Sequence, residues 1–296
     1  MRFRAQVTNA NLLLRVVQCI EKLSKNAMLK LTQDKLHIIV LTDMDSGLQL
    51  WSDVVAVALF SEYRVESLHN NEIYLEFNIE NLQRALRSAQ GAQRVTLKLT
   101  KKQNLPVLSL VIKNMSGTGR EMTLNQDVPV RVLTPDQVSA IMEPQVPTGP
   151  VHIMMPPLNS VRSITERLKL MGDRVTIAAN REGQVTMRVA NDRVEITTYF
   201  RGLQNMTHES SAESLSQADR PSHEFYTATV DMKNFTRFLQ SYHIAPKNIV
   251  CCILEHRALV FYVYIGSTSM FGDTGVDNLN DQTCGSLTYY IPVRQV

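Results

Sequence analysis

Residues 70–101 read NNEIYLEFNIENLQRALRSAQGAQRVTLKLTK, and the spacing of their apolar residues changes twice. Apolar and polar residues alternate from Ile73 to Glu80, which is the pattern of a strand with one buried face. Apolar residues then recur at helical spacing from Leu82 to Ala89, and alternation returns from Val95 to Leu99. The stretch therefore predicts a strand, a short helix and a second strand.

The same block recurs along the chain. Helical patterns begin near residues 10, 80, 158 and 231, and each follows a strand pattern and precedes several others. Between the second and third blocks, residues 134–150 contain four prolines and show no clean period. We therefore expect an α+β protein of two similar domains, at 1–133 and 151–296, joined by a connector at 134–150, with each domain built of two strand-helix-strands repeats.

The sequence pattern also predicts where three of the expected helices end. They run from about residue 10 to Lys25, from Pro157 to Met171 and from Asp231 to His243. Strand patterns fill most of the remaining chain, including one over residues 58–65. Two polar stretches, at 202–222 and 266–285, are expected to be long loops.

Composition narrows the class of protein. The chain has 296 residues, of which 44% are hydrophobic and 20% charged, as in soluble globular proteins. No apolar run is long enough to cross a bilayer, and the N-terminus has no signal-peptide pattern. The four cysteines fit neither a zinc site nor a disulfide scaffold, so we expect reduced cysteines in the cytosol or nucleus; they are Cys19, Cys251, Cys252 and Cys284.

The charge is distributed unevenly, although the net charge is only +3. Residues 11–26, 80–94, 158–171 and 231–243 hold eleven basic and four acidic residues, whereas the remainder of the chain is acidic. One basic helix usually means a solvated surface, and four at matching places would, if they lie side by side, form one basic surface suited to a phosphate backbone. The residues expected to face DNA are Arg15, Lys22, Lys25, Arg84, Arg87, Arg162, Lys169, Lys233 and Arg237.

Sequence motifs for catalysis are absent. The histidines and cysteines lack metal-ligand spacing, and the chain has neither a phosphate-binding loop nor a nucleophile elbow. Asp43 and Asp45 are a weak nuclease signal, because paired carboxylates bind magnesium, but a solvated turn explains them better. We therefore expect no catalytic residues, no metal ligands and no cofactor.

Several stretches resemble a known family. The start MRFRA, the run NNEIYLEF with ENLQRALRSAQGA and VTLKLT, the segment QDVPVRVL and the ending LTYYIPV are similar to the Hus subunit family of the heterotrimeric DNA-damage checkpoint clamp (Rad–Rad–Hus, the nine-one-one complex). That family is related to proliferating cell nuclear antigen. The resemblance covers the whole chain in order and departs from the family pattern in the two polar loops.

The resemblance implies a DNA-clamp fold, with helices on the inner face and antiparallel sheets outside. It also implies a 1:1:1 ring with two unlike clamp subunits, loaded onto duplex DNA without sequence preference by a clamp loader. Repair and checkpoint proteins would dock near the connector, and the location would be nuclear, or also cytoplasmic, with no membrane. Its edge strands pairing with neighbouring subunits would contain Met122, Leu124, Val128, Val130 and Val132, and Val194, Ile196, Thr198 and Phe200.

Other interpretations remain open. A self-assembling, homotrimeric replication clamp would share this fold. A DNA-processing enzyme whose site is assembled in space would leave no motif in the sequence. A scaffold that does not contact nucleic acid would carry the same basic helices only for solubility.

Overall fold

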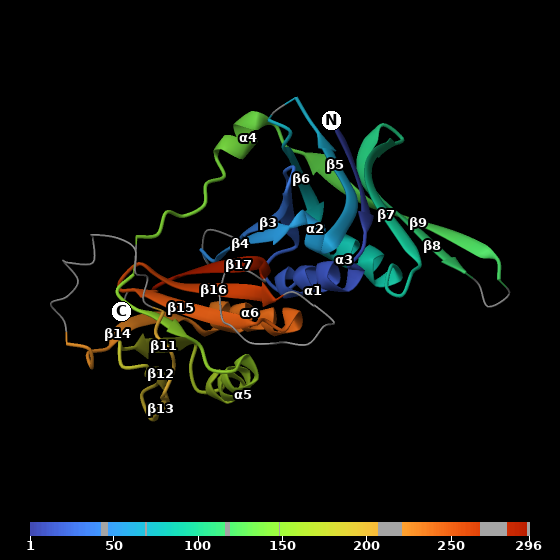
Figure 1. The fold of residues 1–296 in the computed structure, drawn as a ribbon. Helices are drawn as coiled ribbons and strands as arrows, with labels where there is room; N and C mark the ends of the chain where they lie inside the picture. The colour runs from blue at the N-terminus through green and yellow to red at the C-terminus, as the bar shows by residue number, and fades with distance from the viewer. Residues whose placement is uncertain are drawn as a thin grey trace. The chain divides into compact units, whose positions relative to one another are not determined.

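The computed structural model describes residues 1–42, 47–68, 70–115, 119–147, 149–206, 221–266 and 283–294. The chain divides into two compact units, and Figure 1 labels most of their elements. The first unit comprises Met1–Leu41, Leu50–Glu143 and Ile265–Ser286, and the second comprises Thr42–Gln49, Pro144–Tyr264 and Leu287–Val296. The main division falls between Glu143 and Pro144, inside the stretch predicted as the connector.

The first unit contains two longer helices on a largely antiparallel sheet. Its strands follow one another in space in the order β4-β3-β2-β6-β9-β8-β7-β1-β5. The strands are β1 (Arg2–Val7), β2 (Asn26–Leu31), β3 (Lys35–Leu41), β4 (Gln49–Val55), β5 (Phe60–Glu66), β6 (Ile73–Asn78), β7 (Arg94–Lys102), β8 (Leu105–Met115) and β9 (Glu121–Val132). The helices are α1 (Ala10–Ile20), α3 (Ile79–Ser88) and the short α2 (Ala56–Leu59) and α4 (Pro135–Ser139).

Capping residues fix where the two longer helices of this unit begin. The side chain of Asn9 accepts a hydrogen bond from the backbone N–H of Leu12 at 3.0 Å, and Asn78 does the same for Asn81 at 3.2 Å. The apolar stripe of each helix is buried, and α1 packs beside α3. Gln83 Nε2 of α3 donates to a carboxylate oxygen of Glu21, just after α1, at 2.7 Å, and so ties the two helices together.

The second unit also packs two longer helices with antiparallel strands, and its strands form two sheets. One sheet has the order β10-β15-β16-β17 and the other β13-β12-β11-β14. The strands are β10 (His152–Met154), β11 (Arg174–Ala179), β12 (Val185–Ala190), β13 (Glu195–Phe200), β14 (Tyr226–Asp231), β15 (Asn248–Leu254), β16 (Ala258–Gly266) and β17 (Thr283–Pro292). The helices are α5 (Leu158–Leu168) and α6 (Met232–Phe238), which continues as the 3-10 helix η2 (Leu239–Ile244).

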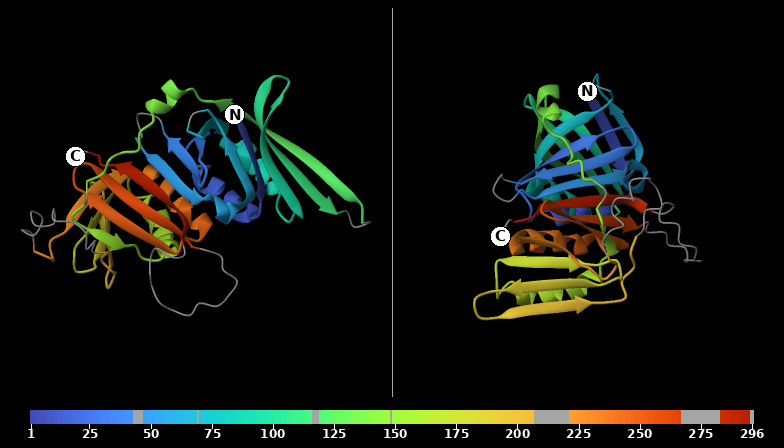
Figure 2. Two further views of the ribbon diagram at one scale, coloured as in Figure 1. Left: turned by 45° about the horizontal axis from the view of Figure 1, so that its top comes forward. Right: turned by 90° about the vertical axis from the view of Figure 1, so that its left-hand side faces the viewer.

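α6 lies against the sheet that contains β16 and β17 (Figure 2), and an aromatic cluster holds it there. The rings of Phe238 and Phe261 stack with centroids 3.8 Å apart, and Tyr289 meets Phe238 edge-on at 5.3 Å. Phe235 adds a tilted contact with Phe261 at 6.0 Å. Because Phe261 lies on β16 and Tyr289 on β17, the cluster joins one helix to two strands.

The four predicted long helices begin where the sequence pattern places them, but some element bounds differ. α1 ends at Ile20 rather than near Lys25, because the N–H of Leu23 turns back to the carbonyl of Ile20 at 3.0 Å. Residues 58–59 belong to the short helix α2, and the strand expected there starts at Phe60. β17 begins at Thr283, inside the second predicted loop. Residues 207–220 and 267–282 of the predicted loops lie outside the described residues.

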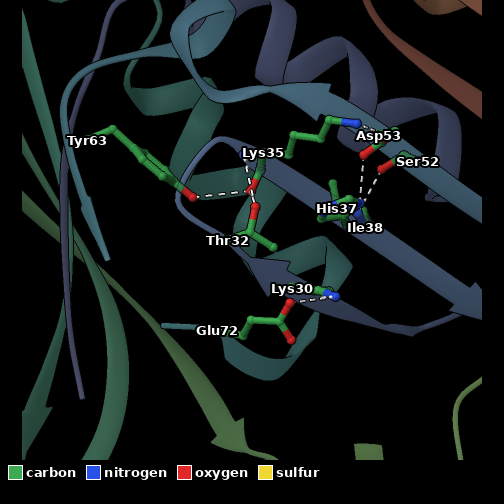
Figure 3. A network of polar contacts seen from close by, with 9 residues as sticks. All are labelled: Lys30, Thr32, Lys35, His37, Ile38, Ser52, Asp53, Tyr63 and Glu72. Carbon is green, nitrogen blue, oxygen red and sulfur yellow. Dashed lines mark hydrogen bonds and ion pairs between the residues drawn. The ribbon is translucent and has the colours of Figure 1, made fainter. Parts of the chain in front are cut away.

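A polar network joins β3 and β4 of the first unit, and an ion pair of β2 lies beside it (Figure 3). One carboxylate oxygen of Asp53 lies 2.7 Å from Nδ1 of His37, and the other lies 2.7 Å from Nζ of Lys35. Beside this group, Nζ of Lys30 lies 3.0 Å from Glu72. The contact with His37 is the largest cause that holds the pKa of Asp53 at about 2, and Lys35 contributes in the same direction.

We predict that Asp53→Asn destabilises the protein by about 1 kcal/mol at pH 7, a value kept small because the carboxylate is part-exposed. The folded pKa lies below the unfolded one, so this contribution is present above the unfolded pKa of 3.8 and is lost as the pH falls through about 2. Urea unfolding between pH 7 and pH 3 measures it: the gap between wild type and variant should narrow below pH 4. The exposed Asp192→Asn serves as the control, and a gap that does not change with pH would contradict the assignment.

Candidate nucleic-acid interface

The basic residues of the first unit lie on one pair of packed helices and the turn that follows one of them. Arg15 lies on α1, Lys22 and Lys25 follow its end, and Arg84 and Arg87 lie on α3. All five are exposed, while the apolar faces of both helices are buried. The exposure of these five side chains therefore agrees with the sequence pattern, although two of them lie in a turn rather than on a helix, and their contact with DNA stays a prediction.

Neighbouring carboxylates neutralise this charge only in part. Arg84 forms an ion pair with Glu80 at 2.9 Å, and Lys22 lies 4.0 Å from Glu21. Both partners of the Arg84 pair are largely exposed, at 68% and 73%, so water screens the interaction. Within the described residues Arg15, Lys25 and Arg87 form no ion pair. These cations are therefore available for phosphate groups.

In the second unit, only two of the four basic side chains predicted to face DNA are exposed. Lys169 and Lys233 are exposed, and Lys169 pairs with Glu166 on the same helix. Arg162 and Arg237, in contrast, are half-buried, so the basic surface expected from the sequence is less exposed at these two positions. Arg237 donates to the Asn234 side chain at 3.4 Å.

Arg162 is held by an aromatic side chain that the sequence pattern did not pair with it. Its guanidinium carbon lies 4.0 Å from the ring centroid of Tyr242, because α5 packs against η2. The ring of His243 packs beside Tyr242, with centroids 4.0 Å apart. A contact between residues so distant in sequence leaves no local signal in the sequence.

β9 departs from the expected edge strand. Residues 121–129 pair with β8, whereas Val130 and Val132 pair with Phe77 and Leu75 of β6. The strand therefore lies between β8 and β6 in the sheet order, and the prediction of an edge is wrong for Val130 and Val132. Val128 is buried, but Met122 and Leu124 are exposed at 59% and 46%.

β13 is the last strand of its sheet. Ile196, Thr198 and Phe200 pair with β12 in register, and within the described residues no strand adjoins the other side of β13. Val194 comes just before the strand, and Tyr199 on it is 60% exposed. An open strand edge with exposed apolar side chains favours pairing with another chain.

A cavity of about 360 Å³ lies in the first unit where the connector leaves β9. Met28, Ile39, Leu133 and Ile141 are among its apolar lining residues. Arg131, also in the lining, donates from Nε to the carboxylate of Glu76 at 2.7 Å. The connector turns into the short helix α4 here, whose capping box is formed by Thr134 and Gln137. An apolar floor with a charged pair beside it suits a peptide anchor.

The structure offers little for catalysis in the part of the chain that it describes. No group of three or more His, Cys, Asp or Glu side chains is arranged to hold a metal ion there. Burial raises the pKa of the Cys252 thiol to about 11 and that of Cys251 well above its usual value, so neither is a ready nucleophile. Asp43 and Asp45 lie outside the described residues. None of the described helices has the length and apolarity of a membrane span.

The fold is shared with a solved structure. The proliferating cell nuclear antigen of Entamoeba histolytica superimposes with a TM-score of 0.69 over 99% of this chain and 99% of that chain, at 14% identity. The expected clamp fold, with antiparallel sheets and a few helices in two domains, is therefore confirmed.

Sequence comparisons give the family. A family model described as Hus1-like protein matches residues 1–295. Checkpoint protein hus1 of Schizosaccharomyces pombe is 33% identical, with 98% of each chain covered. Checkpoint protein HUS1 of Homo sapiens is 30% identical over 88% of this chain and 94% of the human protein, and the Dictyostelium discoideum homolog is 29% identical over 99% and 98%. The chain therefore belongs to the Hus1-like protein family.

Proposed function

We propose that this chain is a non-enzymatic subunit of a ring-shaped heterotrimeric sliding clamp that encircles duplex DNA and serves as a platform in DNA-damage checkpoint signalling and repair. Membership of the Hus1-like family and the clamp fold support this function. The relatives in fission yeast and human are named checkpoint proteins. Such a role places the protein in the nucleus.

One structural observation carries the proposal. In each unit, helices bury their apolar stripes and leave basic side chains in solvent, from Arg15 and Arg84 in the first to Lys169 and Lys233 in the second. Lys and Arg that meet phosphates contribute affinity without reading bases, so a ring lined by them holds any duplex and can slide along it. Arg162 and Arg237 are half-buried, so their side chains would meet phosphates with less conformational freedom than the exposed lysines of the same unit.

Partner subunits complete the ring in this proposal. The open edge of β13 and the exposed Met122 and Leu124 of β9 are the surfaces that two unlike clamp subunits would cover in a 1:1:1 ring. A clamp loader would open and close the ring around DNA. Repair and checkpoint proteins would dock at the connector cavity, with an apolar anchor near Ile141 and Leu133.

A second candidate is a homotrimeric replication clamp. The fold similarity to proliferating cell nuclear antigen favours it, because that protein shares the whole architecture with this chain. The sequence match to the Hus1-like family favours the heterotrimer instead. The mass of the assembly separates the two.

The assembly prediction concerns the chain alone and with partners. We expect the isolated chain to be mainly monomeric at micromolar concentration and to enter a 1:1:1 complex when two unlike clamp subunits are added, because its edges need complementary surfaces. Light scattering coupled to size exclusion measures both states. Met122→Lys with Leu124→Lys should lower the yield of the complex without lowering the melting temperature. A stable homotrimer of the isolated chain would instead support the second candidate.

The basic surface yields a prediction about DNA. Arg84→Glu with Arg87→Glu should weaken the retention of any duplex by the assembled ring and reduce the salt slope of binding by about two units, since each arginine neutralises about one phosphate. Stability should change by less than about 0.5 kcal/mol at each site, since both side chains are exposed and the Glu80 pair contributes little. A salt titration of DNA binding and a thermal melt measure the two effects.

Arg120→Glu is the control for this pair, because Arg120 is an exposed arginine outside the four helices. It should leave the salt slope unchanged. An unchanged slope in the double variant would remove α3 from the DNA-binding surface, and a collapsed melting temperature would show that these arginines are structural.

The last prediction of this section concerns catalysis. We expect no nuclease, ATPase or polymerase activity from the purified chain, because the described residues offer no metal cluster and the sequence contains no phosphate-binding loop. Assays with Mg²⁺ and labelled DNA or ATP measure this. Nuclease activity that co-purifies with the chain and disappears in Asp43→Ala or Asp45→Ala would overturn the proposal of a non-enzymatic subunit.

A further inference from the structure

The second unit contains a cavity whose lining includes none of the residues predicted to face DNA or a partner subunit. It has a volume of about 540 Å³ and lies between the turn that joins β10 to α5 and the turn that joins η2 to β15. Its floor is apolar, and Met154, Met155, Pro157, Pro246 and Ile249 contribute to it. A cavity of this size accommodates a large apolar side chain together with the backbone that carries it.

The walls of this cavity are fixed before any ligand arrives. The N–H of Met155 donates to the carbonyl of Ile249 at 2.8 Å, and that of Lys247 donates to the carbonyl of Tyr264 at 2.9 Å. Ala245, directly before Pro246, has φ 47° and ψ 66°, a left-handed conformation that alanine rarely adopts and that a following proline disfavours. Such strain collects at sites of function, and a rigid cavity costs little ordering on binding.

The charge around the cavity is positive. Lys247 is the charged residue in the lining, and it is exposed. Tyr242, also in the lining, carries the guanidinium of Arg162 on its ring at 4.0 Å. The carboxylate next along α5, Glu166, already pairs with Lys169. Among the described residues that line the cavity there is no Asp or Glu.

We propose that this cavity is a docking site for an acidic peptide segment of a partner protein, which inserts one apolar side chain and sets its carboxylates against Lys247 and Arg162. Duplex DNA uses the charges but gains nothing from a floor of methionine, proline and isoleucine, whereas an anchored acidic peptide uses both. Methionine side chains also adapt to anchors of different shape. Arg162 is also one of the residues predicted to face DNA, whereas Lys247 is not, so Lys247 distinguishes this site from the DNA-binding surface. The site is separate in sequence and in unit from the connector cavity.

The experiment uses the full chain labelled with ¹³C at the methionine methyl groups. The probe is a nine-residue peptide with a central leucine between two runs of four acidic residues. We expect the methyl signals of Met154 and Met155, assigned through Met154→Leu and Met155→Leu, to shift on titration with micromolar affinity. Replacing the central leucine by serine should weaken binding about tenfold, since the apolar anchor is removed.

Two lysine variants separate this site from the DNA-binding surface. Lys247→Glu should weaken peptide binding about tenfold and leave the salt slope of DNA binding by the assembled ring unchanged. Lys233→Glu, on the exposed face of α6, should reduce the salt slope of DNA binding and leave peptide binding unchanged. Because each variant affects one ligand, failure of the peptide site and failure of the DNA-binding proposal are distinguishable.

Three outcomes would overturn the docking site. They are the absence of a shift at the two methionines, equal binding of the leucine and serine peptides, and shifts at these methionines with duplex DNA but not with the peptide. The thermal melt of each variant shows whether the fold is retained, and the wild-type titration stands even where a variant fails to fold.

Discussion

Burial of the apolar stripes of the longer helices is the interaction on which the rest of this structure depends. α1, α3 and α5 have 11, 10 and 11 residues, lengths at which an isolated helix is marginal in water. They are stable because their stripes pack inside their units, and this packing turns the opposite faces outward. The positions of Arg15, Arg84, Arg87 and Lys169 in solvent are therefore a result of how the core is filled.

The elements whose signals are local could be predicted from the sequence. The change of apolar period between Phe77 and Leu82 marks the end of β6 and the start of α3, and the Asn78 cap agrees with it. The repeated spacing of the blocks also gives the starts of α1, α5 and α6 closely. The signals for these features lie in residues close together in the sequence, so the pattern predicts where the elements begin, although packing stabilises them.

The features that the sequence did not predict depend on residues far apart in the chain. Nothing near Arg162 shows that Tyr242 will lie under its guanidinium, because this contact forms only when α5 packs against η2. The split pairing of β9 is similar, since alternation shows that a strand exists but not which neighbour each part takes. The short helix α2 was missed because a four-residue turn is too brief to show a helical period.

The split pairing of β9 limits how its length can change during evolution. Residues 121–129 are in register with β8, and Arg131, in the ladder with β6 that follows, is paired with Glu76 at the connector cavity. Because side chains alternate between faces along a strand, inserting or deleting one residue between these ladders would move Arg131 to the opposite face or shift Met122 and Leu124 from theirs. Pairing with two neighbours at once therefore fixes the residue count of this strand.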